Sequence, residues 1–247
     1  MRGVLIGIDL GTTALKVAAF DGETGKVAAA FSQRLPVSTS DEGRREEDPG
    51  VVLRALRKVL DAVSGITGGL QNVRGIGVAA QGGSTIIADR RTGKALTPMR
   101  LWNDSRALPE FRELTEQYPA NYWRKFSLRD EPGMGLARLL RLQAESPELL
   151  NEDNIYVGAG EYVYFHLTGE WRQDAGNALQ IGCYDARREV LIERAAKLVN
   201  ANLSFFAPLR CGHETHPLSS NAAKRFGLPA GIPVAGPYMD HEAGYMS

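Results

Sequence analysis

The chain has 247 residues, 43% hydrophobic and 23% charged, a composition that is ordinary for a globular protein and excludes a disordered or fibrous chain. Its 29 basic and 29 acidic residues cancel, so no overall field attracts nucleic acid or an anionic membrane. We therefore expect a small-molecule ligand, with no nucleic-acid partner and no membrane partner.

Three antiparallel strands are predicted at the amino end. Residues 4–9 and 15–20 are apolar runs that contain β-branched side chains, and a turn at residues 11–13 joins them. Turn-forming residues 21–25 then lead into a third strand at residues 26–31. The three strands should form a meander.

A helix and a parallel strand are predicted next. Asp48 is a typical N-cap and Pro49 a typical first helical residue, and apolar side chains recur at helical spacing over residues 52–63. Residues 73–80 are an apolar run, and a strand that follows a helix in this way usually runs parallel to its neighbour. The polar, glycine-rich turn at residues 81–83 would then lie at the carboxyl end of that strand.

The rest of the chain is predicted to be mainly helical. Turn residues near position 90 suggest a second, smaller hairpin within residues 85–102. A short strand is predicted at residues 232–236, and residues 244–247 resemble the interior of an element, which suggests that a longer chain was cut there. The helices expected beyond residue 107 cover residues 108–118, 136–144, 161–167, 192–198 and 221–226.

The cellular compartment is predicted from three features. No apolar stretch approaches the roughly 20 residues that a membrane-spanning helix needs. The first strand begins close to Met1 and soon reaches an acidic residue, which leaves no room for a signal peptide. Two cysteines are too few for a disulfide framework. We expect a cytoplasmic protein.

The first turn carries groups suited to a phosphate. Gly11, Thr12 and Thr13 offer backbone N–H groups and hydroxyls, and Asp9 at the strand end can hold Mg²⁺ directly or through water. An ordinary hairpin turn with an aspartate cap would need the same residues. The position of the turn between two apolar strands at the start of the chain resembles the first phosphate-binding loop of the actin-like ATPase superfamily.

Five further segments resemble the FGGY family of carbohydrate kinases. Their order and spacing along the whole chain carry the resemblance more than any single one does. They are the acidic-proline entry at residues 46–49, the sugar-loop strand at 77–84, the Trp-x-Asp-x-Arg segment at 102–106, the stretch at 162–185, and the strand and loop with the family's catalytic aspartate at 234–244.

The resemblance implies a fold, a reaction and a missing part. The fold would be α/β, a ribonuclease H-like mixed sheet flanked by helices, with residues 1–247 forming the sugar-binding N-terminal domain. ATP with Mg²⁺ would donate its γ-phosphoryl group to a hydroxyl of a sugar or polyol, and a C-terminal nucleotide-binding domain absent from this chain would complete the enzyme. The oligomeric state stays open, with a homodimer as one alternative.

Asp240 is the predicted catalytic base, because a carboxylate has to accept the proton of the attacking hydroxyl. The alternative is an aspartate that only caps the helix after it. The two roles can coexist.

The resemblance also places sugar contacts on the loops at residues 81–83 and 102–106. Amide, carboxylate and guanidinium groups can bind several hydroxyls, and an indole face can cover the apolar side of a sugar. A core tryptophan beside a surface salt bridge is the alternative. The predicted contacts are Gln81, Gly82, Gly83, Trp102, Asn103, Asp104 and Arg106.

Two departures from the family pattern limit the prediction. Xylulose kinases carry Gln-Met-His-Gly where this chain has Gln81, Gly82, Gly83 and Ser84, so the sugar stays open, with a ketopentose favoured. The family's lysine signature begins with Arg138 here, and we expect a structural role for it.

Three classes of function therefore compete. The favoured one is half of a sugar kinase that is inactive without its second half. A non-catalytic sugar-binding or regulatory module of the same fold would bind ligand without transferring phosphate. An actin-like or chaperone-like ATPase is disfavoured by the sugar-loop glycines and by Trp102.

Overall fold

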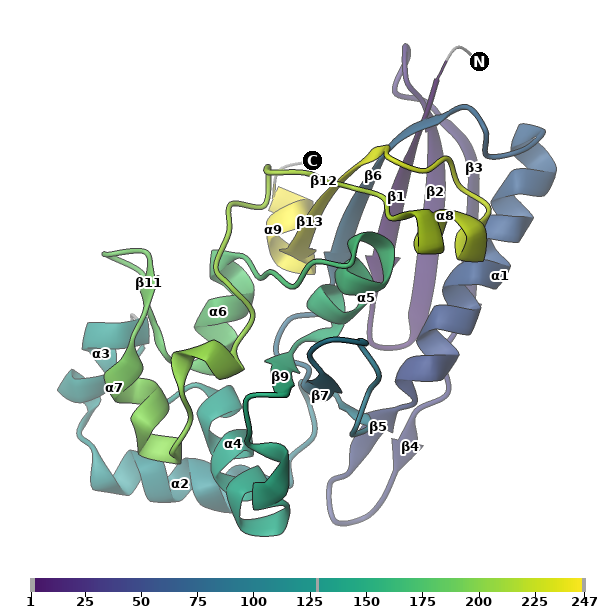
Figure 1. Ribbon diagram of the computed structural model, residues 1–247. Helices are drawn as coiled ribbons and strands as arrows, with labels where there is room; N and C mark the ends of the chain where they lie inside the picture. Colours follow the sequence, from purple (N-terminus) through teal and green to yellow (C-terminus); the bar gives the residue numbers. More distant parts are fainter. Residues whose placement is uncertain (1–2, 128, 246–247) are drawn as a thin grey trace.

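A six-stranded mixed sheet organises the computed structural model, which describes residues 3–127 and 129–245 (Figure 1). The strands lie in the order β12-β13-β6-β1-β2-β3, and the first three along the chain form the predicted antiparallel meander. The predicted parallel strand β6 pairs with β1 on one side and with β13 on the other. Their bounds are β1 (Val4–Leu10), β2 (Ala14–Asp21), β3 (Val27–Arg34), β6 (Val73–Ala80), β12 (His216–Pro217) and β13 (Pro233–Met239).

One face of the sheet is buried under three helices. In β1 every second side chain is buried, namely Val4, Ile6, Ile8 and Leu10, because successive residues of a strand point to opposite faces. These side chains join one hydrophobic cluster with α1 (Pro49–Thr67), α5 (Ala159–Thr168) and α8 (Ser220–Phe226). Asp9 alternates with them and therefore points away from the core.

Helix α1 begins and ends as the sequence predicts. The side chain of Asp48 accepts a hydrogen bond from the N–H of Gly50 at 2.7 Å, and Pro49 is the first helical residue. The helix stops at Gly68, whose φ of 73° is a left-handed conformation that suits glycine. These caps fix where α1 meets β2 and β3.

A second lobe of helices lies beside the sheet (Figure 1). It has a hydrophobic cluster of its own, which includes the fully buried Trp123 and Leu136. No helix of residues 3–127 and 129–245 is both long and apolar enough to cross a bilayer. The lobe contains α2 (Leu108–Gln117), α3 (Ala120–Ser127), α4 (Met134–Glu145), α6 (Ala175–Ile181), α7 (Glu193–Ala196), the 3₁₀ turns Pro147–Leu149, Lys197–Val199 and Leu203–Phe205, and the ribbon β10 (Tyr184–Asp185) with β11 (Val190–Leu191).

The predicted second hairpin forms only in part. Its two arms do face each other, through the isolated bridges Thr85 to Arg100 and Ala88 to Ala95. Each arm nevertheless forms its main backbone pairing with another strand, because short strands pair with a neighbouring strand whose backbone groups are still unpaired. Strand β7 (Ile86–Asp89) pairs with β9 (Asn154–Val157), and β8 (Met99–Arg100) joins β5 (Arg45–Glu47), which in turn pairs with β4 (Ser38–Thr39).

The last element is the short helix α9 (Asp240–Tyr245), which follows β13 directly. The expectation that the chain's last residues belong to an element holds as far as Tyr245. Met1, Arg2, Met246 and Ser247 lie outside the described residues.

Candidate functional site

The carboxyl ends of three neighbouring strands lie at the same level of the sheet, which we call the shared edge, and three of the predicted groups lie there. Ala80 at the end of β6 pairs with Leu10 on β1 and with Met239 on β13. The turn after β1, the loop after β6 and Asp240 after β13 therefore leave the sheet at the same level. Because neighbouring strands lie about 5 Å apart, β1 and β13 are about 10 Å apart at this edge. Asp9 and Asp240 thus lie on the same side of the molecule.

Asp9 and the threonine turn form the first corner of this edge. Asp9 Oδ2 forms an ion pair with Nζ of Lys16 at 3.1 Å. Both side chains are well exposed, so the pair stabilises the fold by about 0–1 kcal/mol. Gly11 donates its N–H to the carbonyl oxygen of Ala14, which uses that donor within the turn. The hydroxyls of Thr12 and Thr13 are the better candidates for phosphate contacts.

The glycine loop after β6 lies against side chains from distant elements. Gly83 has a φ of 74°, a conformation in which any other residue would be strained. A Cβ at Gly82 would lie 2.3 Å from Sδ of Met239, so Met239 occupies the space that a side chain would need. Gln180 on α6 approaches both glycines, and its amide lies 3.7 Å from the same sulfur.

Gln81 lies beneath this loop. Its side chain is only 2% exposed, and its amide nitrogen is 4.0 Å from Sδ of Met99. Its Oε1 has no hydrogen-bond partner. The structure therefore places Gln81 behind the loop, where it can act on a sugar only through the glycines or by a change of side-chain orientation.

Trp102 connects the glycine loop to the threonine turn. Its indole N–H donates to the hydroxyl of Thr12 at 3.0 Å, and its Cβ lies close to Gly83. The side chain is 55% exposed, so the alternative of a core tryptophan is wrong. Asn103 beside it is exposed as well. Trp102 thus offers an open aromatic surface next to the predicted phosphate turn.

Asp104 and Arg106 hold the shape of the Trp102 segment. Asp104 is buried and accepts hydrogen bonds from the Arg106 guanidinium and from the N–H of Arg45. Burial raises the pKa of Asp104, but these hydrogen bonds outweigh it and keep the pKa below its usual value. Arg106 also pairs with Glu46 at 2.5 Å. The salt bridge expected beside Trp102 is therefore present, but it is partly buried and holds the Trp102 segment in place.

Asp240 is half-buried at the start of α9, where its Oδ1 accepts the N–H of His241 at 2.8 Å. Two residues further on, Glu242 packs against Gly176 of α6, where a Cβ would lie 2.2 Å from Oε1 of Glu242. Burial, and then the neighbouring Asp174 carboxyl, raise the pKa of Glu242 to about 7. Asp174 Oδ2 has no other partner, and a protonated Glu242 can donate to it. This contact fastens α9, and with it Asp240, to α6.

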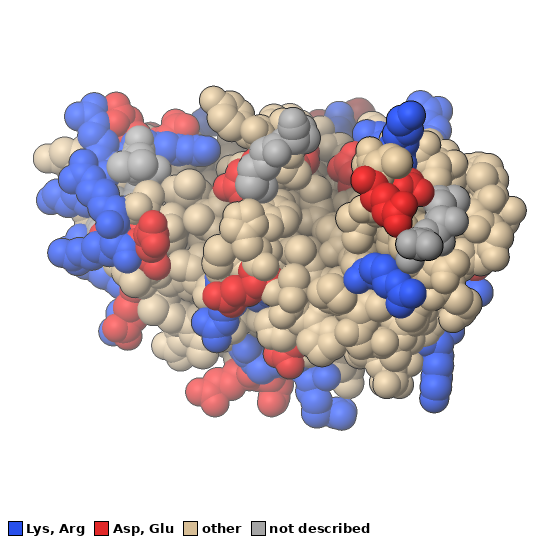
Figure 2. All heavy atoms as spheres, turned by 90° about the horizontal axis from the view of Figure 1, so that it is seen from above, with Lys and Arg blue, Asp and Glu red and all other residues tan. Residues whose placement is uncertain are grey.

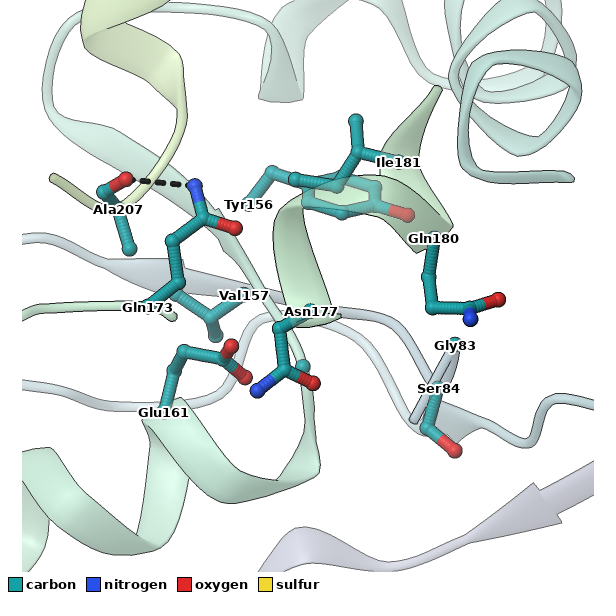
Figure 3. A pocket seen from close by; sticks show the side chains of 11 residues that line it. Gly83, Ser84, Tyr156, Val157, Glu161, Gln173, Asn177, Gln180, Ile181 and Ala207 are labelled. Atoms are coloured by element: carbon teal, nitrogen blue, oxygen red, sulfur yellow. Dashed lines mark hydrogen bonds between the residues drawn. The ribbon is translucent and has the colours of Figure 1, made fainter. Parts of the chain in front are cut away.

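A small polar cavity of about 20 Å³ lies behind Gly83 and Ser84. Figure 3 shows the Glu161 carboxyl from α5 beside the Asn177 side chain, while the amide of Gln173 donates to the carbonyl of Ala207. Glu161 is 2% exposed, its Oε2 has no partner, and burial raises its pKa to about 8. The raised pKa favours the protonated, neutral form of this carboxyl at pH 7.

Gln180 and Met239 are site residues that the sequence did not reveal. Gln180 belongs to the stretch that resembles the family, but nothing in that stretch shows which side chain reaches Gly83. Met239 stands directly before the predicted base, and this adjacency was the one available signal. Both side chains shape the space above the glycine loop.

One face of the molecule carries charges of both signs. Figure 2 shows basic and acidic side chains at the rim of one face, with mostly uncharged atoms between them. This distribution fits the net charge of zero. No strong field of one sign marks this face as a polyanion-binding surface.

The sheet order and its edge define a class of protein. An antiparallel meander followed by two parallel strands, with an acidic residue near the end of the first strand and a threonine turn after it, is the ribonuclease H-like fold of the actin-like ATPases. Within that class, the profile of the FGGY family of carbohydrate kinases, N-terminal domain, matches residues 4–247, and the chain belongs to this family.

Curated relatives and solved structures agree with this assignment. The chain is 29% identical to the xylulose kinase of Escherichia coli over 97% of its own length and 49% of that enzyme. It is 28% identical to the erythritol kinase of Brucella abortus over 96% of its length and 46% of that protein. The crystal structure of xylulose kinase from Rhodospirillum rubrum superposes with a TM-score of 0.89 at 25% identity and covers 98% of this chain and 50% of that one. The chain thus spans about half the length of the relatives that it matches.

Proposed function

We propose that this chain is the sugar-binding half of an ATP-dependent kinase that phosphorylates a hydroxyl of a sugar or polyol, with a ketopentose such as xylulose as the favoured substrate. The relatives named above support this, since they include xylulose and erythritol kinases. A nucleotide-binding half would be joined to its carboxyl side, and ATP as co-substrate fits a cytoplasmic location.

One observation carries the proposal. A continuous series of contacts leads from Thr12 through Trp102 to the glycine loop, and from there through Met239 to Asp240. Residues that are far apart in the sequence thereby line one edge of the sheet. A protein that only bound sugar would not need the threonine turn and a carboxylate at opposite ends of such a series.

In the proposed reaction, Asp240 accepts the proton of the substrate hydroxyl while the hydroxyl oxygen attacks the γ-phosphorus of ATP. The bond from that phosphorus to the bridging oxygen breaks, and ADP leaves with the electron pair. Thr12 and Thr13 donate hydroxyl hydrogen bonds to the phosphate oxygens. Trp102, Asn103 and the glycine loop orient the sugar.

Asp9 offers carboxylate oxygens, which are ligands of the kind that Mg²⁺ prefers. Its carboxylate is exposed and needs to give up only the weak pair with Lys16. Residues 3–127 and 129–245 contain no group of three His, Cys, Asp or Glu side chains that could enclose a metal. Mg²⁺ is usually held by one or two carboxylates together with phosphate oxygens and water, and it would neutralise charge on the phosphates here.

The test uses this chain joined to its nucleotide-binding half. Pentuloses, hexuloses and polyols are first screened by thermal shift, and the hits are assayed for ADP release. We expect sugar-dependent ADP release, and Asp240→Asn should reduce kcat by about 10²–10⁴-fold, the usual contribution of a positioned base. Asp61→Asn, an exposed aspartate on α1, is the matched control and should leave the rate unchanged. Sugar-induced stabilisation without any ADP release would instead support the non-catalytic binding module.

A further inference from the structure

Arg138 on α4 is a buried guanidinium that has no carboxylate partner among residues 3–127 and 129–245, and burial lowers its pKa from the usual value. It is 3% exposed, and its guanidinium donates only to neutral oxygens. Nη1 donates to the carbonyl of Gly83 and, at 3.2 Å, to the hydroxyl of Thr85. Nη2 donates to the carbonyls of Leu101 and Trp102, at 2.7 Å and 3.0 Å.

The four acceptors belong to the two loops that form the proposed sugar site. Two of them, on Gly83 and Thr85, belong to the glycine loop and the residues that lead into β7, and two belong to the start of the Trp102 segment. Each nitrogen serves one loop, so the planar guanidinium sets the spacing between the two loops. Nε of Arg138 has no hydrogen-bond partner among the described residues, so the burial of this group is only partly compensated. A buried charge is costly unless it is fully hydrogen-bonded, and a purely structural position could be filled by an apolar side chain without that cost.

Helix α4 makes a second contact of the same kind. Arg141, nearly one turn further on, donates to the carbonyl of Arg106 at 2.8 Å and pairs with Glu145 at 2.6 Å. Helix α4 therefore binds the Trp102 segment at both of its ends, through Arg138 at the first and through Arg141 at the second. The side of the segment that faces away from α4, with Trp102 and Asn103, stays exposed.

We propose that Arg138 is a positioning residue that locks the glycine loop and the Trp102 segment at a fixed separation, so that sugar affinity depends on it. This inference rests on the proposed function and deepens it. It replaces the purely structural role expected from the sequence. It also explains why a guanidinium suits this place, because its two terminal nitrogens are held apart in one plane and each donates to a different loop, whereas the three donors of a lysine all leave a single nitrogen.

The test compares Arg138→Met, Arg138→Lys and the control Leu142→Ala, a cavity variant in the same helix, in the protein that contains both halves. Amide hydrogen exchange is followed in peptides that cover residues 81–85 and 100–106. The amides of Thr85, Arg100 and Asp104 are protected there by backbone hydrogen bonds. In Arg138→Met we expect exchange of both segments to accelerate about tenfold or more, since two sets of charge-assisted hydrogen bonds are lost. In Arg138→Lys we expect one segment to stay protected. Leu142→Ala should lower the melting temperature without selectively affecting these two segments.

The kinetic part separates positioning from general destabilisation. KM for the sugar should rise about tenfold or more in Arg138→Met and less in Arg138→Lys, while KM for ATP stays unchanged. Wild-type exchange rates in Arg138→Met, or an unchanged sugar KM despite faster exchange, would overturn the inference. A wild-type protein that phosphorylates no sugar refutes the proposed function instead, and the exchange comparison then still decides whether Arg138 locks the two loops.

Discussion

Replacement of Glu161 by glutamine should make the folded chain less sensitive to alkaline pH. Glu161 is fully buried beside the small polar cavity, and burial raises its pKa from 4.5 to about 8. The folded protein therefore holds a proton that the unfolded chain has already lost between these two pH values. Stability then falls as pH rises from about 4.5 to 8, because the unfolded state binds fewer protons there.

The size of the effect follows from the width of that interval. A group that is protonated only when folded lowers the free energy of unfolding by about 1.4 kcal/mol per pH unit. Between pH 6 and pH 8 the wild type should therefore lose roughly 2–3 kcal/mol relative to Glu161→Gln, whose amide is a neutral isostere of the protonated acid. Glu47 and Glu242 also have raised pKa values, but they are present in both proteins and cancel in the comparison.

Urea unfolding of both proteins at pH 6, 7 and 8 measures this difference. A constant offset between them does not matter, because the prediction concerns the slope with pH. Glu152→Gln, at an exposed position, is the control and should run parallel to the wild type. Parallel curves for Glu161→Gln would show that Glu161 is already ionised at pH 6, and the description of a neutral carboxyl behind the glycine loop would then be wrong.

Two further substitutions test the loop and the first long helix. Gly82→Ala places a Cβ 2.3 Å from Sδ of Met239, so it should cost about 1–3 kcal/mol and weaken sugar-induced stabilisation. Added Met239→Ala should recover part of this, with a coupling of at least about 0.5 kcal/mol in a double-mutant cycle by urea unfolding; strictly additive effects would mean that the two residues do not touch. Asp48→Ala removes the N-cap of α1 and should cost about 1 kcal/mol, while Asp48→Asn should retain most of it. In a chain of this size the loss corresponds to a melting temperature about 2–4 °C lower in calorimetry, and equal losses in both variants would argue against the cap.

Local signals predicted the sheet and α1 because their causes are local. The meander follows from apolar runs separated by turn residues, and α1 from the cap at Asp48 and the proline after it. Strand β9 was not predicted, since three apolar residues after Asn154 become a strand only when an unpaired strand such as β7 lies beside them. The partial failure of the second hairpin has the same cause.

The site residues also fall into those predicted from local signals and those placed by the packing of distant elements. Asp9, Asp240 and the glycine loop were found because each lies at the end of an apolar strand or directly after it, and parallel strands bring such ends together. Gln180 and Arg138 come from helices of the second lobe, and their roles depend on how that lobe packs on the sheet. Burial also separates Gln81 from Trp102, which looked alike as sugar contacts in the sequence.

The sheet itself sets the scale of the proposed chemistry. Strands β1 and β13 lie about 10 Å apart at the shared edge. The proposed transfer would have to fit within this span, with Asp9 as the residue that would hold Mg²⁺ at one end and Asp240 as the proposed base at the other. Hydrogen-bonded strands cannot easily change this separation. The parts that can differ from one substrate to another are the loops above the edge, namely the glycine loop under Met239 and the Trp102 segment held by Arg138. Sugar selectivity should therefore respond to substitutions in those loops and in their supports, whereas substitutions at Asp9 or Asp240 should affect transfer to every sugar alike.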